Sequence, residues 1–73
     1  MTFEEFLASY NDWIKENGGI PAGIRKGQMW FNLLNAARPD IANRIRGAYK
    51  VDPFYRDENL GAFFSYVQGA WDQ

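Results

Sequence analysis

The chain has 73 residues, of which 47% are hydrophobic, 18% aromatic and 23% charged; this composition is typical of one folded domain, residues 1–73, and not of a disordered segment. It contains neither cysteine nor histidine, which excludes disulfides and thiolate or imidazole metal sites and favours a reducing compartment such as the cytoplasm. Apolar runs are too short to cross a membrane, and the acidic start, MTFEEF, lacks the features of a signal peptide. We therefore expect a cytoplasmic protein that does not bind membranes.

The net charge of −1 is unevenly distributed along the chain. Residues 1–20 and residues 51–73 each carry four acidic side chains against one basic one, whereas residues 21–50 carry six basic side chains against one acidic one. This layout has two interpretations. Acidic outer helices can pair with a basic central segment and solvate the surface, or the basic segment can form a face for an anionic partner.

Residues 2–17 are predicted to form the first helix. Thr2 and Glu5 have the spacing of a capping box, and Gly18 and Gly19 favour the end of the helix. One face carries apolar residues at helical spacing: Phe3, Phe6, Leu7, Tyr10, Trp13 and Ile14. Residues 18–24, GGIPAGI, form a connector, in which Ile20 and Ile24 are expected to fold back and close one end of the core.

The second helix is predicted over residues 25–37, with Trp30 and Leu34 on its apolar stripe. Phe31 lies off that stripe, so it either packs against a further segment or remains exposed. Gly27 weakens the first turn by up to about 1 kcal/mol relative to alanine, unless close packing requires it. Arg38 ends the helix, because a residue before proline avoids the helical conformation.

Pro39 is predicted to start a short helix of about eight residues that Gly47 closes. After an irregular stretch to Arg56, Asp57 is the expected cap of a last helix, in which Gly61 and Gly69 would be places where another helix comes close. The apolar face of this last helix comprises Leu60, Phe63, Phe64, Val67 and Trp71. The sequence thus predicts an all-α fold, a compact small helical bundle of three main helices plus one short helix around an aromatic-rich core.

No residue pattern indicates an enzyme. The adjacent carboxylates at Glu4–Glu5 and Asp57–Glu58 are explained by helix capping and the helix dipole. The glycine-rich connector lacks the lysine and hydroxyl ending of a phosphate-binding loop, and no dense cluster of oxygen ligands suggests a metal. We expect no catalytic, cofactor-binding or metal-binding residues.

The aromatic surplus favours a protein-binding surface. A small helical core cannot hide thirteen rings, so several of Trp30, Phe31, Tyr49, Tyr55 and Tyr66 are expected at the surface, although the rings could instead simply pack the core and its rim. Tyrosine, tryptophan and arginine dominate the energetic hot spots of protein interfaces. The predicted partner-binding residues are Arg44, Arg46, Tyr49, Lys50, Tyr55 and Arg56.

Two alternatives remain open. The second and third helices superficially resemble a helix-turn-helix, in which Arg44, Arg46 and Lys50 would meet the phosphates of a nucleic acid. The slightly acidic net charge and the scarcity of base-reading side chains weigh against this interpretation. The other alternative is a structural protein that self-associates through its spare aromatic side chains.

The stretch RPDIANRIRGAYKVDPFYRDENLGAFFSYV resembles a pattern found in small uncharacterised proteins of tailed bacteriophages. The matching positions in this sequence are Arg38, Pro39, Asp40, Arg46, Gly47, Asp52, Pro53, Phe54 and Tyr55. The resemblance implies a phage origin, and small phage proteins of this size frequently bind and redirect or block a host protein, including components of antiviral defence. The expected function is therefore that of a non-enzymatic, phage-encoded modulator or inhibitor, which acts by steric occlusion in the bacterial cytoplasm.

Overall fold

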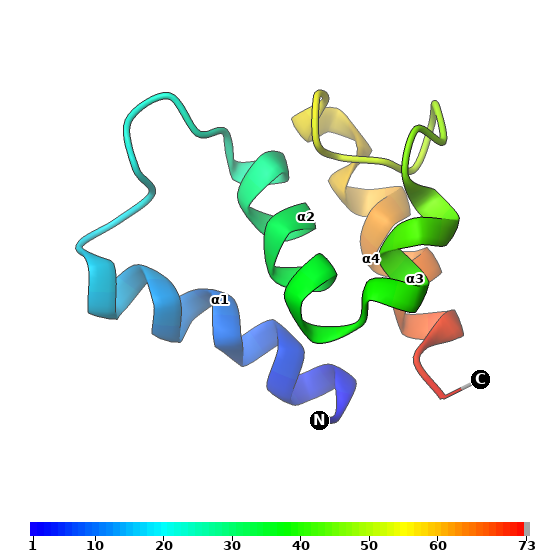
Figure 1. Cartoon of the computed structure of the whole chain (residues 1–73), viewed down its shortest axis with the longest axis horizontal. Coiled ribbons are helices and arrows are strands. Elements are labelled where there is room, and N and C mark those ends of the chain that lie inside the picture. Colours follow the sequence, from blue (N-terminus) through cyan, green and yellow to red (C-terminus); the bar gives the residue numbers. More distant parts are fainter. Residues whose placement is uncertain (73) are drawn as a thin grey trace.

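The computed structural model describes residues 1–72 and confirms the predicted all-α class, since these residues form helices and no strand (Figure 1). Three longer helices and one short helix are present, as expected. A short 3-10 turn, η1, precedes the last helix. The elements are α1 (Phe3–Asn17), α2 (Lys26–Ala37), α3 (Pro39–Ile45), η1 (Asp57–Asn59) and α4 (Leu60–Ala70).

The capping box at the start of α1 is confirmed. The Thr2 hydroxyl accepts from the Glu5 backbone N–H at 3.1 Å, and the Thr2 N–H donates to Glu5 Oε1 at 2.8 Å. This second hydrogen bond stabilises the ionised carboxylate, so it holds the pKa of Glu5 below its ordinary value. At the other end, Gly18 takes the left-handed conformation (φ 72°) and its N–H bonds to Ile14.

Aromatic rings join the helices into one core. Phe6 of α1 lies 5.5 Å from Trp30 of α2 and 5.2 Å from Trp71, which follows α4. Trp30 also meets Phe64 of α4 edge-on at 4.8 Å. The short helix α3 contributes Ile41 and Ile45, both fully buried. Each aromatic pair stabilises the fold by roughly 0.5–1.5 kcal/mol beyond the burial of its surface. The rings therefore supply the contacts that a chain of this length needs.

Arg38 connects the α2–α3 turn to the end of α4. Its guanidinium donates to both oxygens of Asp40, at 3.0 and 2.9 Å, and to the carbonyl of Trp71 at 2.7 Å. It also lies over the Trp71 ring, 5.0 Å from the ring centre. The bidentate contact lowers the pKa of Asp40 to about 2. Arg38 was predicted only to end α2, but it also binds Trp71 and so holds the segment after α4 against the α2–α3 turn.

Two of the five aromatic residues expected near the surface are buried. Trp30 is 7% exposed and Phe31 is 3% exposed, so the expectation that several of the five lie at the surface is met by Tyr49, Tyr55 and Tyr66 and not by these two. Phe31 lies off the main stripe of α2, and it is buried because the ring of Phe54 packs against it edge-on at 5.6 Å. Of the two fates predicted for Phe31, packing against a further segment is the correct one.

Two expectations about tight packing are wrong. Ile20 and Ile24 are only partly buried and lie outside the hydrophobic cluster, because the connector between α1 and α2 swings away from the helices (Figure 1). Gly61 and Gly69 are exposed, and a Cβ atom at either would meet nothing within 4 Å. The close helix approach that these glycines were expected to allow does not occur there.

Asp57 does not cap α4. Its carboxylate instead accepts from the Gly27 N–H at 2.9 Å, in the first turn of α2, where a negative charge complements the helix dipole. The first turn of α4 follows η1 directly and has no side-chain cap. Finally, among residues 1–72 no helix has the length and apolar character that crossing a bilayer requires.

Candidate functional site

The loop from Arg46 to Arg56, called here the 46–56 loop, carries five of the six predicted partner-binding residues: Arg46, Tyr49, Lys50, Tyr55 and Arg56. It joins α3 to η1 and stands at the upper right of the molecule in Figure 1. Gly47 starts it with a φ of 78°, a left-handed conformation that favours glycine. The chain therefore leaves α3 at a sharp, defined angle.

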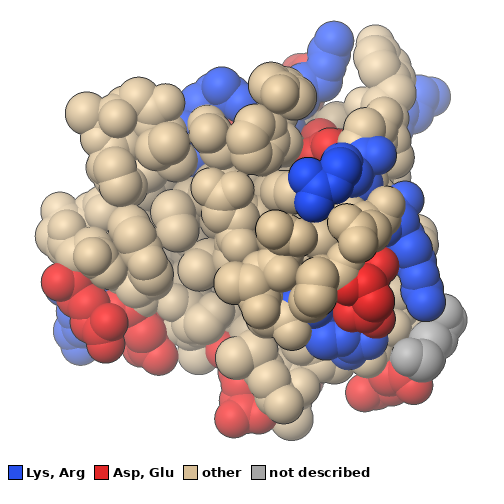
Figure 2. All heavy atoms as spheres, in the orientation of Figure 1, with Lys and Arg blue, Asp and Glu red and all other residues tan. Residues whose placement is uncertain are grey.

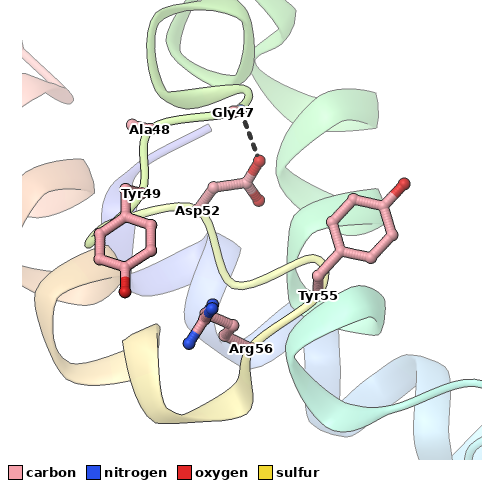
Figure 3. A pocket seen from close by; sticks show the side chains of 6 residues that line it. All are labelled: Gly47, Ala48, Tyr49, Asp52, Tyr55 and Arg56. Atoms are coloured by element: carbon pink, nitrogen blue, oxygen red, sulfur yellow. Dashed lines mark hydrogen bonds between the residues drawn. The ribbon is translucent and has the colours of Figure 1, made fainter.

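Asp52 holds the loop together from within. Its Oδ2 atom accepts from the Gly47 N–H at 2.7 Å, and its Oδ1 atom accepts from the Phe54 N–H at 2.9 Å. Figure 3 shows this carboxylate directed toward Gly47, between the two tyrosines. Hydrogen bonds to an ionised acceptor contribute roughly 1.5–3 kcal/mol each when shielded from water, and less where exposed. One side chain thus fixes both halves of the loop.

Side chains from other elements fix the outside of the loop. The Asn59 amide nitrogen of η1 donates to the carbonyl oxygens of Tyr49 and Asp52 at 3.0 and 2.9 Å. The Arg25 guanidinium, before α2, donates to the carbonyl of Phe54. Because its polar backbone groups are bound in this way, the loop is preorganised without any strand or helix of its own.

Two tyrosines project from this fixed backbone. Tyr49 is 71% exposed and Tyr55 is 79% exposed, which confirms the surface position expected for both. Their rings stand on opposite sides of Asp52 (Figure 3). Arg56 places its guanidinium over the Tyr49 ring, 5.0 Å from the ring centre. The third ring expected at the surface, Tyr66 on α4, is 40% exposed.

Two neighbouring hollows flank Tyr55. The first, of about 160 Å³, is lined by Gly47, Ala48, Tyr49, Asp52, Tyr55 and Arg56 (Figure 3). The second, of about 270 Å³, is lined by Phe31, Arg46, Gly47, Asp52, Phe54 and Tyr55. Both are smaller than the roughly 300–1,000 Å³ of typical small-molecule pockets, so they suit individual side chains of a partner better than a free ligand.

Arg46 occupies the edge of the larger hollow. Its guanidinium lies over the Phe31 ring at 5.2 Å, and its Nη2 atom makes long hydrogen bonds to the side-chain oxygens of Asn35 and Asn43, at 3.4 and 3.3 Å. These contacts orient the guanidinium, and both acceptors are uncharged.

Four predicted residues meet at the hollows and two do not. Arg46, Tyr49, Tyr55 and Arg56 line them, whereas Arg44 and Lys50 are exposed and line neither. The prediction missed the apolar floor, which Phe31 and Phe54 provide. The signal available for it was the position of Phe31 off the core stripe of its helix.

Several basic side chains lie at this end of the molecule. In Figure 2, Lys and Arg groups occupy much of the upper right and right edge, with a few acidic atoms among them, while more acidic atoms lie along the lower edge. With carboxylates of residues 1–72, Arg44, Arg46 and Lys50 form no ion pair, whereas Arg56 pairs with Glu58 at 3.1 Å. Arg46 at the larger hollow, and Arg44 and Lys50 elsewhere on the surface, therefore have no carboxylate partner within residues 1–72.

The side chains at the hollows suit recognition. They offer aromatic faces, guanidinium donors and a carboxylate already bound to backbone N–H groups. Within residues 1–72, the side chains form no group of three or more acidic residues that could hold a metal ion. Comparison of the chain with protein-family models, with curated proteins and with solved structures finds no match.

Proposed function

We propose that the protein is a non-enzymatic protein-binding module, encoded by a bacteriophage, that modulates or inhibits a bacterial host or antiviral-defence protein by steric occlusion. The observation that carries the proposal is the pair of highly exposed tyrosines, Tyr49 and Tyr55, on a loop whose backbone is fixed by hydrogen bonds. Their partner would lie in the host cytoplasm.

Preorganisation is what makes this surface suitable for binding. Ordering a loop on association costs binding free energy, and a loop that is already ordered avoids that cost. Tyrosine adds a large contact area with few rotatable bonds. The neighbouring arginines, Arg46 and Arg56, add charged donors at the edge of the same surface. A partner covering the tyrosines would have that part of its own surface blocked, which is the proposed mechanism of inhibition.

The phage origin rests on the resemblance of residues 38–67 to small tailed-phage proteins. Several of the matching positions have structural roles at the site. Gly47 opens the 46–56 loop, and Asp52 fixes it. Arg38 and Asp40 pair at the α2–α3 turn. Part of the shared pattern, Gly47 and Asp52, thus coincides with residues that build the surface, whereas Arg38 and Asp40 support the fold elsewhere.

Affinity capture tests the proposal. The purified protein, a Tyr49→Ala/Tyr55→Ala variant and a Tyr66→Ala variant are used as baits in lysate of a bacterial host, and captured proteins are quantified by mass spectrometry. The wild type and Tyr66→Ala should retain the same protein, and the double variant should lose it. Tyr66 is a matched control because it is an exposed tyrosine that lines neither hollow. Equal capture by all three baits, or no capture, would exclude the proposed surface.

A second candidate function is nucleic-acid binding through Arg44, Arg46 and Lys50. The observation in its favour is that these three cations make no ion pair with carboxylates of residues 1–72. Phosphate contacts give an affinity that falls steeply as salt increases. Gel shifts with duplex and single-stranded DNA at low ionic strength test it, and the absence of any shift removes this candidate.

A further inference from the structure

The larger hollow places an aromatic floor beside a guanidinium that pairs with no carboxylate of residues 1–72. Phe31, Phe54 and Tyr55 supply the apolar wall, and Arg46 stands at its edge. We infer that this hollow receives an aromatic or aliphatic side chain from an acidic segment of the partner protein, and that a carboxylate next to this side chain pairs with Arg46. The inference rests on the proposed protein-binding function and specifies the chemistry of the partner.

The apolar part of the hollow fits a single large side chain. Its volume is about 270 Å³, and the rings of Phe31 and Phe54 meet edge-on at 5.6 Å to form its floor. The ring of Tyr55 lies 4.8 Å from that of Phe54 and continues the apolar wall to the exposed rim. An inserted side chain would be desolvated on these sides, which is the setting in which interface anchors contribute most.

The charges at the hollow favour an anionic neighbour for that side chain. Arg46 has five N–H donors, and its hydrogen bonds go to neutral amide oxygens at 3.3 Å or more. Among residues 1–72, Asp52 is the carboxylate that lines the hollow, and both of its oxygens already accept backbone N–H groups. Arg44 and Lys50, exposed nearby along the chain, add to the positive field. A partner carboxylate therefore gains more here than a partner ammonium group.

A random-peptide display library tests the inference directly. The full-length protein selects binders at low ionic strength, and the consensus peptide is then synthesised together with a counterpart in which asparagine and glutamine replace aspartate and glutamate. The consensus should place aspartate or glutamate next to an aromatic or aliphatic residue. Arg46→Gln and the uncharged peptide should each weaken binding about tenfold, the expected effect of losing one charge-assisted hydrogen bond, whereas Tyr66→Ala should bind normally.

Several outcomes would overturn the acidic-segment inference. A neutral or basic consensus, or a consensus peptide indifferent to Arg46→Gln, would refute it; if such a peptide still required Tyr55, the protein-binding surface itself would stand. Selection of no peptide would also refute it, and the lysate capture would then decide the proposed function separately. If light scattering showed a dimer that Arg46→Gln converts to a monomer, the occupant would be a second copy of this chain, and the inference would again be wrong.

Discussion

Gly27 lies where α2 meets the 46–56 loop. A Cβ atom there would overlap the carbonyl oxygen of Pro53 and lie 2.8 Å from Asp57 Oδ1. The close packing that would require a glycine at this position is therefore present. The same contact lets the Gly27 N–H reach the Asp57 carboxylate. A single missing methyl group thus permits the loop to rest on the first turn of α2.

Replacing Gly27 with alanine should destabilise the protein by roughly 1–3 kcal/mol, the usual range for overpacking, even though alanine is the better helix former. Urea unfolding followed by circular dichroism measures this change. Gly61→Ala is the matched control, since the added Cβ atom would meet nothing within 4 Å. This substitution should stabilise the helix by roughly 0.5–1 kcal/mol. If both variants shift the free energy of unfolding in the same direction, the claim that Gly27 packs too tightly for a Cβ atom is contradicted.

The Arg38–Asp40 pair makes stability depend on pH in acid. The pKa of Asp40 falls from its ordinary 3.8 to about 2, because Arg38 binds the ionised carboxylate. A lowered pKa in the folded state contributes stability that is complete above the unfolded value and is lost as the pH falls through the folded value. Asp40 should therefore stabilise the protein near neutral pH and cease to do so at about pH 2.

An Asp40→Asn variant isolates this contribution. Its free energy of unfolding should be below that of the wild type near neutral pH, and the difference should shrink as the pH falls from 3.8 towards about 2. Urea unfolding at a series of pH values provides the comparison. A difference that stays constant over this range would mean that the ion pair is not the cause.

The sequence states which side chains are charged or aromatic, but residue patterns predicted their positions in the fold only in part. Tyr49 and Tyr55 were expected at the surface and are there. Trp30 and Phe31 were among the candidates for the surface and are buried, because partners from α1, α4 and the loop cover them. Helical periodicity describes one face of one helix. It does not reveal that an irregular segment will cover a second face.

At the scale of elements, the limits of α1 and the start of α3 were predictable because they depend on local signals, whereas the cap expected for α4 was wrong. Thr2, Gly18 and Pro39 act within one turn of the helices that they begin or end. The 46–56 loop was expected only as an irregular stretch. Its order comes from Asp52 within the loop, from Asn59 just after it and from Arg25, which is distant in sequence. Such contacts leave no periodic pattern.

Asp52→Asn should loosen the 46–56 loop and leave the helices intact. Asparagine offers one acceptor oxygen where aspartate offers two, so either Gly47 or Phe54 loses its partner. Amide hydrogen exchange should speed up about tenfold at the affected N–H group, the equivalent of one charged hydrogen bond. Exchange within α1 should not change. Uniform acceleration over the whole chain, or none, would contradict the role given to Asp52.

At the scale of the whole molecule, the fold brings basic and aromatic side chains together at one end. The sequence predicted a basic centre between acidic ends, and the fold gathers Arg46 and Arg56 around the exposed tyrosines at the hollows. Arg44 and Lys50 stand outside these hollows. How the segments come together depends on the aromatic contacts among α1, α2 and α4, which pair residues far apart in the chain. Composition and periodicity do not specify those pairs.

The central claim, that the 46–56 loop contacts a partner protein, is tested most directly by site-specific photo-crosslinking in living bacteria. A benzophenone-bearing amino acid replaces Tyr55 in one variant and Tyr66 in another, and both lie exposed on the surface. On irradiation, the variant at position 55 should form a discrete adduct with a bacterial protein, and the variant at position 66 should not. Adducts at position 66 alone, or the same adducts at both positions, would contradict a partner bound at the 46–56 loop.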